Sequence, residues 1–197
     1  RVSVVEVQQE LAHTMFVNPD SSSEPLNDRP PLRLSAMVSF TDGRIFQLTV
    51  IVNHLRSLND ANSESVGSNG WLTLGARVRA KRQAQAEDLA NLVQTLQTAD
   101  PTAHIVLVGD FNAMEFNDGL GDSMHVIAGT PTPDNETAVT GDGLDLVSPD
   151  LVNLAASAPA GDRYGYVFDG NAQNLDHVLV SASVVNGTVA RRVEHAR

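Results

Sequence analysis

Alternating apolar and polar residues predict β-strands in the first third of the chain. Val2 to Val7 is a short valine-rich run, and Leu32 to Phe40 alternates as a half-buried strand does. Asp42-Gly43 then gives a two-residue hairpin signal. We therefore expect the following apolar stretch, Arg44 to Val52, to pair with the strand before it.

A long helix and further short strands are predicted in the rest of the chain. Apolar residues recur at helical spacing from Leu74 to Leu96, and Ile105 to Val108 is a continuous apolar run typical of a buried strand. Further strands are expected at Tyr164–Phe168, Leu175–Ser181 and Val184–Val193. The loop candidates are the segments rich in Gly, Pro, Ser, Asn and Asp: 18–31, 59–70 and 117–150. With no repeat and no linker, 1–197 is predicted to be a single domain.

Composition narrows the classes of protein to consider. A hydrophobic content of 42% is enough to form a core. The chain contains no run of about 18 apolar residues, so no membrane span is predicted. The chain has no Cys, which excludes disulfides, zinc–thiolate sites and Cys nucleophiles. Its net charge of −11 argues against binding nucleic acid by bulk charge alone, although metal ions or a local basic patch could still bind phosphate. The chain opens at Arg1 without Met or leader, so we expect a mature or excerpted chain.

Polar clusters lie at the ends of three predicted strands. The string 53–57 (NHLRS) follows the strand that ends at Val52, and 109–112 (GDFN) follows the strand that ends at Val108. Asp176-His177 begins a later strand. Polar residues at the ends of buried strands are placed where α/β proteins usually form their sites.

Each cluster also has a structural interpretation. Asp110 and Asn112 are two residues apart, so they could share a hard cation such as Mg²⁺, Mn²⁺ or Ca²⁺, or they could form an Asx-turn. Asp176 and His177 are adjacent, so they point to opposite faces unless the strand twists or ends there. His54, like His177, would alone be a structural histidine more often than a catalytic one. Their joint occurrence favours function.

The predicted helix has a basic start. Arg77, Arg79, Lys81 and Arg82 oppose the helix dipole there, either as a solvated helix start or as a patch that faces phosphate. Trp71 precedes this cluster and could stack on a base or pack within the protein.

Four strings carry a specific resemblance: NHLRS, RVRAKRQAQAEDLANLV, VLVGDFNA and RYGYVFDGNAQNLDHVLVS. In this order they resemble the endonuclease/exonuclease/phosphatase superfamily, which includes deoxyribonuclease I, and especially its bacterial, often secreted, nuclease-like members. The resemblance runs from about Arg29 onward and more weakly from Arg1. It implies an α/β (α+β) fold, a four-layer αββα sandwich of two mixed β-sheets flanked by helices. This chain would be its C-terminal half to two-thirds, with the N-terminal portion missing.

The resemblance also implies roles for the strand-end residues. Asp110 would orient or deprotonate the attacking water and contribute to the metal site, and Asn112 would help to hold the phosphate. Asp176 would bind the metal or its water network, and His177 would contact the scissile phosphate by a hydrogen bond or as an acid. His54 would be a second histidine on the phosphate side.

Further residues are implied as binding groups. Asn53, beside His54, and Arg29 would contact phosphate, as would Arg56, where the family prefers Lys with its different geometry. The family takes its metal-binding Glu from a strand that ends in Gln-Glu. Glu10 ends such a string, but few residues separate it from His54, so we expect the principal metal ligand outside this chain and keep Glu10 as the alternative.

The expected function is metal-dependent hydrolysis of nucleic acid, DNA in preference to RNA, with Mg²⁺ or Mn²⁺/Ca²⁺ as cofactor. A phosphatase or a phospholipid or inositol-phosphate phosphodiesterase of the same fold, and a non-catalytic truncated scaffold, remain alternatives. A half-fold would expose a sheet edge and an apolar face, so we also expect this chain to associate with its missing part or to be poorly soluble. The family resemblance favours a secreted or periplasmic location.

Overall fold

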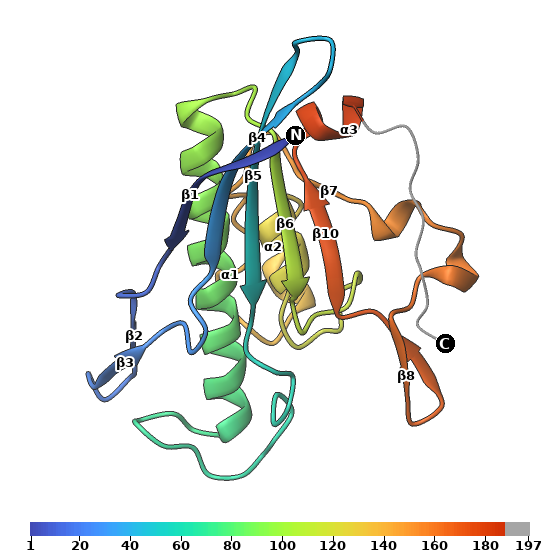
Figure 1. Ribbon diagram of the computed structural model, residues 1–197. Helices are drawn as coiled ribbons and strands as arrows, with labels where there is room; N and C mark the ends of the chain where they lie inside the picture. The colour runs from blue at the N-terminus through green and yellow to red at the C-terminus, as the bar shows by residue number, and fades with distance from the viewer. Residues whose placement is uncertain (188–197) are drawn as a thin grey trace.

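One mixed sheet organises residues 1–187, the part of the chain that the computed structural model describes (Figure 1). Its six strands have the order β1-β4-β5-β6-β10-β7. Their bounds are β1 (Val2–Gln9), β4 (Leu32–Ser39), β5 (Ile45–His54), β6 (Ile105–Asp110), β7 (Val152–Asn153) and β10 (Asp176–Val180). β5 and β6 run parallel, whereas the other neighbours are antiparallel.

Two hairpins lie outside this sheet. β2 (Met15–Val17) pairs with β3 (Ser23–Pro25), and β8 (Tyr166–Phe168) pairs with β9 (Asn171–Gln173). The β8–β9 hairpin projects beside the lower ends of β6 and β10 in Figure 1. It therefore lies at the end of the sheet where the predicted polar clusters gather.

Helix α1 (Leu74–Ala99) makes the crossover that two parallel strands require, from β5 to β6. The hydroxyl of Thr73 accepts a hydrogen bond from the N–H of Ala76 at 3.1 Å and so caps its start. α1 and the shorter α2 (Ser123–Ala128) lie behind the sheet in Figure 1. Short 3-10 turns occupy Asp134–Glu136, Ala155–Ser157 and Ala160–Asp162, and α3 (Ala182–Gly187) follows β10.

The two faces of the sheet differ in burial. Ile51, Leu107 and Leu179 share one register position across β5, β6 and β10, are fully buried, and belong to the core that α1 covers. The next register position places Val52 and Val178 on the opposite face, where they are 46% and 36% exposed. We call this second face the open face.

Most predicted elements are confirmed, and the α+β class with a mixed sheet is confirmed as well. Residues 1–187 supply one large sheet and one helical layer, so the second large sheet of the predicted sandwich stays a prediction. The segments 18–31 and 117–150 are not all loop, because the first contains β3 and the second contains α2. None of the described helices combines the length and the apolar character that a bilayer crossing needs.

The strand predicted at Val184–Val193 is wrong for its first part. Residues 184–187 belong to α3, and residues 188–193 lie outside the described residues. The N–H groups of Val184 and Val185 both donate to the carbonyl of Ser181, which is a helical turn. The hydroxyl groups of Ser181 and Ser183 donate to the carbonyl of Ala103, and these bonds hold the turn against the sheet.

Candidate active site

Three polar side chains stand in a row at one edge of the open face. His54 pairs in register with Asp110, and Asp110 pairs with Asp176, across β5, β6 and β10. Val52 lies two residues before His54, and Val178 lies two residues after Asp176. Residues two apart in a strand share a face, so all three side chains point to the open face as the two valines do. Nε2 of His54 lies 3.5 Å from Oδ2 of Asp110. We call these three residues the edge triad.

Asp110 is oriented by an Asx-turn. Its Oδ1 accepts the backbone N–H of Asn112 at 2.8 Å, and its side chain is 34% exposed. Oδ2 is left to face His54. The structure therefore shows the turn that the sequence allowed and also presents one carboxylate oxygen to the open face.

The side chain of Asn112 makes a buried contact with the segment after β5. Its backbone is in the left-handed region with φ 47°, and its buried Nδ2 donates to the carbonyl of Leu55 at 2.9 Å. This bond joins the loop after β6 to the segment after β5. The structure thus gives the side-chain amide of Asn112 a structural contact.

His177 lies on the helix-covered face of β10 and is 2% exposed. Its Nε2 lies 2.8 Å from the carbonyl oxygen of Ala113, so Nε2 carries the proton. Nδ2 of Asn153 lies 3.1 Å from Nδ1, and Oδ1 of Asn153 accepts the N–H of Ala155, so the amide nitrogen faces the ring. Nδ1 is therefore an acceptor, and burial lowers the pKa of this neutral His177. The side chains of His177 and Asp176 therefore lie on opposite faces of β10.

Asn53 and Arg56 support the same strand end. Asn53 is buried, and its Nδ2 donates to the carbonyl of Val108 at 3.1 Å, which ties β5 to β6. Nη1 of Arg56 lies 3.8 Å from a carboxylate oxygen of Asp28. Arg29 follows Asp28 in an exposed bend, far from His54 along the chain.

Glu10 lies apart from the edge triad. It follows β1, and in the sheet order β4 stands between β1 and the β5 strand that carries His54. Its Oε1 accepts from Nε of Arg33 at 2.5 Å, in an ion pair whose two side chains are 14% and 18% exposed. The structure therefore gives Glu10 a cationic partner on β4.

The charges of the edge triad are coupled. Burial raises the pKa of Asp176, and the nearby carboxylate of Asp110 raises it further. Burial and then both carboxylates also raise the pKa of Tyr166. Tyr166, whose hydroxyl donates to Gln173 at 2.7 Å across the β8–β9 hairpin, therefore lies near the site. Nothing in the sequence indicated that Tyr166, within a predicted strand, would lie near the site.

The donor set fits a hard divalent cation in part. Asp110 and Asp176 offer carboxylate oxygens, and Mg²⁺ commonly takes only one or two carboxylates together with waters and substrate phosphate. A cation would also offset the charge of Asp110, which adds to the effect of burial on the pKa of Asp176. Within residues 1–187, no three His, Cys, Asp or Glu side chains are grouped closely enough to hold a metal ion. The pair therefore offers carboxylate oxygens for a cation without a complete ligand set.

The basic start of α1 is largely buried. Lys81 and Arg82 are 3% and 5% exposed, and Nζ of Lys81 lies 3.1 Å from Asp28. Arg77 pairs with Glu24. The cluster is turned inward, where it holds the loops that precede it, so the prediction of a solvated helix start is wrong.

Trp71 packs within the protein. Its ring stacks on Phe16 with centroids 6.0 Å apart, and Nε1 donates to Oδ1 of Asn18 at 2.9 Å. These contacts confirm the packing interpretation, since the ring is already engaged.

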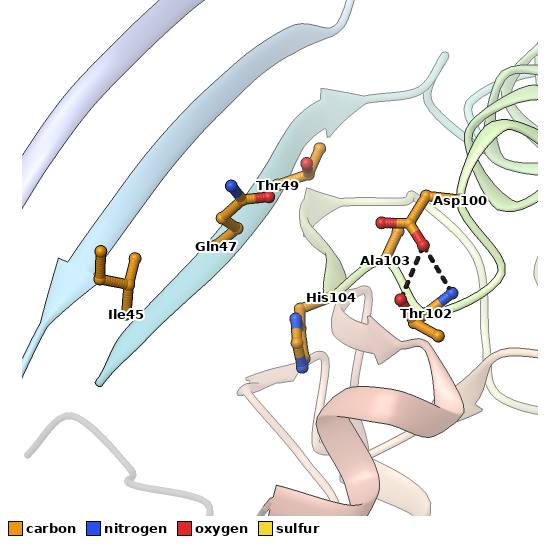
Figure 2. A pocket seen from close by; sticks show the side chains of 7 residues that line it. All are labelled: Ile45, Gln47, Thr49, Asp100, Thr102, Ala103 and His104. Atoms are coloured by element: carbon orange, nitrogen blue, oxygen red, sulfur yellow. Dashed lines mark hydrogen bonds between the residues drawn. The ribbon is translucent and has the colours of Figure 1, made fainter. Parts of the chain in front are cut away.

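A hollow of about 270 Å³ lies at the far end of the sheet (Figure 2). β5 contributes its first half, and the turn after α1 contributes the opposite wall, where Asp100 accepts hydrogen bonds from Thr102. The lining residues are Ile45, Gln47, Thr49, Asp100, Thr102, Ala103 and His104. None of them belongs to the edge triad, so this hollow is separate from the candidate site.

The architecture is that of the DNase I-like, or endonuclease/exonuclease/phosphatase, fold. No protein-family model matches the sequence, and no curated protein does. Among solved structures, ANGEL2, a 2′,3′-cyclic phosphatase, is 15% identical with a TM-score of 0.50, over 92% of this chain and 55% of ANGEL2.

Two further solved structures show weaker similarity. The human Nocturnin catalytic domain with bound sulfate is 16% identical with a TM-score of 0.45, over 92% of this chain and 49% of that one. An endonuclease/exonuclease/phosphatase family protein from Bacteroides thetaiotaomicron is 16% identical with a TM-score of 0.43, over 93% and 52%. The chain thus spans about half the length of the proteins it matches. The fold assignment rests on ANGEL2, and at this identity it is an assignment of fold alone.

Proposed function

We propose that this chain carries part of the catalytic site of a metal-dependent phosphoester hydrolase, most specifically a phosphodiesterase that cleaves nucleic acid. The observation that carries the proposal is the edge triad: His54, Asp110 and Asp176 in register on three adjacent strands. Two carboxylates and an imidazole supply a base, a cation-binding pair and a hydrogen-bond donor, which phosphoester hydrolysis needs.

Asp110 would act on the attacking water. Its Oδ1 is held by the N–H of Asn112, so Oδ2 is the oxygen left to accept a proton from water. His54 is 41% exposed beside Oδ2, where its ring could donate to a phosphoryl oxygen. The Asx-turn keeps the carboxylate in place without a large side-chain entropy loss during the reaction.

Asp110 and Asp176 would hold the divalent cation, Mg²⁺ first and Mn²⁺ or Ca²⁺ as alternatives. When bound, this cation supplies positive charge that offsets the charge of the phosphate. Their carboxylates end neighbouring strands in register, and the pKa of Asp176 is raised by burial and then by the charge of Asp110.

DNA is the preferred substrate in this proposal, with RNA second. A net charge of −11 disfavours general attraction to a polyanion, so binding would depend on groups close to the site. The neighbour ANGEL2 is described as a 2′,3′-cyclic phosphatase, which supports phosphoester chemistry on this fold without choosing the substrate. A secreted or periplasmic location belongs to the same proposal.

A substrate panel tests the proposal. The chain is assayed with bis(p-nitrophenyl) phosphate, p-nitrophenyl phosphate, single-stranded DNA, RNA and phosphatidylinositol vesicles, each with Mg²⁺, Mn²⁺, Ca²⁺ or EDTA. We expect metal-dependent cleavage of the diester and of DNA, at least tenfold faster than cleavage of the monoester. Hydrolysis of the monoester alone would favour a phosphatase, hydrolysis of the vesicles alone would favour a lipid phosphodiesterase, and no hydrolysis of any substrate would contradict the proposal.

A further inference from the structure

The segment after β5 is held by hydrogen bonds from outside its own strand. The N–H of Leu55 donates to the carbonyl of Asp110 at 3.0 Å, and the carbonyl of Leu55 accepts from Asn112 at 2.9 Å. The N–H of Arg56 donates to Oε1 of Gln85 at 2.8 Å, and the carbonyl of Arg56 accepts from Nη1 of Arg82. Both backbone polar groups of two consecutive residues are therefore satisfied.

The two α1 side chains that bind Arg56 are buried. Gln85 is 3% exposed and Arg82 is 5% exposed, and their spacing of three residues places them on one side of the helix. Nε2 of Gln85 also donates to the carbonyl of Leu26 at 2.9 Å. Gln85 thus joins the segment after β5 to a loop on its other side.

The burial of Arg82 is electrostatically costly and needs a reason. A guanidinium loses its hydration when it is buried, and this loss lowers the pKa of Arg82 to about 10. The charges of Asp118 and Asp110 favour its cationic form. A buried cation that donates to a backbone carbonyl beside the edge triad positions that backbone more strongly than a neutral donor would.

We propose that Arg82 and Gln85 are positioning residues for His54: they hold the backbone of Arg56 so that the imidazole two residues earlier stays beside Asp110. The inference rests on the proposed function for its kinetic consequence, but the backbone restraint can be measured without any activity. It also gives a reason for the basic start of α1.

The test compares two buried glutamines of the same helix. Gln85→Met removes the acceptor for the N–H of Arg56, whereas Gln97→Met removes a matched bond, from Nε2 to the carbonyl of Pro149 at 3.0 Å, far along α1. We expect Gln85→Met to speed hydrogen exchange of the Arg56 amide at least tenfold, with the Leu107 amide unchanged. Gln97→Met should leave both amides as in the wild type.

The kinetic arm uses bis(p-nitrophenyl) phosphate. We expect Gln85→Met and Arg82→Met to lower kcat at least tenfold with KM within threefold, and Arg82→Lys to recover part of kcat because Lys can donate to the same carbonyl. Gln97→Met should keep the wild-type kcat. Equal loss of kcat in the Gln85 and Gln97 variants would overturn the positioning role.

A conservative variant guards against misfolding. Gln85→Glu keeps an acceptor oxygen for the N–H of Arg56 and loses the donor to Leu26, so slow exchange of the Arg56 amide is expected in it. Fast exchange there, or unchanged exchange in Gln85→Met, would overturn the proposal. If the wild type hydrolyses nothing while the exchange pattern holds, the proposed function fails and the backbone restraint stands.

Discussion

Asp110 divides its two carboxylate oxygens between two tasks. Oδ1 accepts the N–H of Asn112 and sets the side-chain orientation, while Oδ2 faces His54 at 3.5 Å. His177 shows the opposite case, because both of its ring nitrogens are engaged in hydrogen bonds within the protein. At the scale of single residues, the free polar atoms therefore identify the site better than the presence of a histidine does.

His177 gives a direct test of this distinction. We predict that His177→Leu lowers the free energy of unfolding by about 2 kcal/mol, because it leaves the carbonyl of Ala113 and the amide of Asn153 without a partner. Turnover of the folded variant should fall less than tenfold. Urea unfolding and diester hydrolysis measure the two effects, and a loss of turnover above a hundredfold with unchanged stability would instead make His177 part of the chemistry.

His125 predicts a pH dependence of stability. Its hydrogen bond to the buried carboxylate of Asp122 raises the pKa of His125 above its ordinary value of 6.5. Its contribution is therefore complete below pH 6.5 and is lost as pH rises through the folded-state pKa.

Unfolding measured from pH 5.5 to 8.5 should show this loss in the wild type and not in His125→Gln. The exposed His13 supplies the control, since His13→Gln should retain the wild-type slope. Identical slopes in the wild type and His125→Gln would contradict the assignment.

At the scale of elements, the parallel pair β5 and β6 brings the edge triad together. Parallel strands end at the same edge, so His54 and Asp110 meet, and antiparallel β10 begins where they end. Gly109 permits the close approach, because a Cβ there would lie 2.0 Å from the carbonyl oxygen of Asn53, with φ at +128°.

Gly109→Ala should therefore lower the free energy of unfolding by more than about 2 kcal/mol and separate the ends of β5 and β6. Gly161→Ala is the matched control, since nothing lies within 4 Å of its added Cβ, and it should change stability by about 0.5 kcal/mol or less. Thermal unfolding of both variants measures this. Wild-type stability of Gly109→Ala would show that the strands do not need this approach.

The periodicity of apolar residues predicted several strands and the long helix, because it indicates which face of each element is buried. The alternation in β4 and the continuous apolar run of β6 were sufficient for those strands, and helical spacing predicted α1. Helix α3 was missed because its Val184-Val185 pair favours a strand, whereas the turn begins at the Ser181 carbonyl. Local sequence does not encode such tertiary contacts.

The candidate site was predictable only in part for the same reason. Strand ends placed His54, Asp110 and Asp176, but the inward orientation of His177 and the contacts of Arg82 and Gln85 depend on packing between distant segments. Tyr166 comes near the carboxylates because it lies in a hairpin, and no spacing in the sequence indicates this position.

At the scale of the whole molecule, the open face of the sheet exposes apolar side chains that no other described layer covers. Register places Val4 and Val7 of β1, with exposed fractions of 63% and 56%, on the same face as Val52 and Val178. A sheet normally buries its apolar face against another layer. The edge triad lies at one end of this face, so whatever covers the face also borders the site.

We therefore predict that the isolated chain self-associates. Analytical ultracentrifugation should give a mass above 21.0 kDa that rises with concentration, and Val4→Lys combined with Val7→Lys should lower it. Val66→Lys, in a loop where Val66 is 91% exposed, should not change the mass. A wild-type monomer at all concentrations would contradict this expectation.

The most direct test of the edge triad is the Mg²⁺-dependent rate of bis(p-nitrophenyl) phosphate hydrolysis by the wild type and by Asp110→Asn. Asn keeps the size of the side chain and can keep the bond from the Asn112 N–H, but it removes the charge that would accept the water proton. We predict hydrolysis by the wild type that EDTA abolishes, and a loss of about 10²–10⁴-fold in Asp110→Asn with stability little changed. Hydrolysis that survives in Asp110→Asn at the wild-type rate would contradict the account.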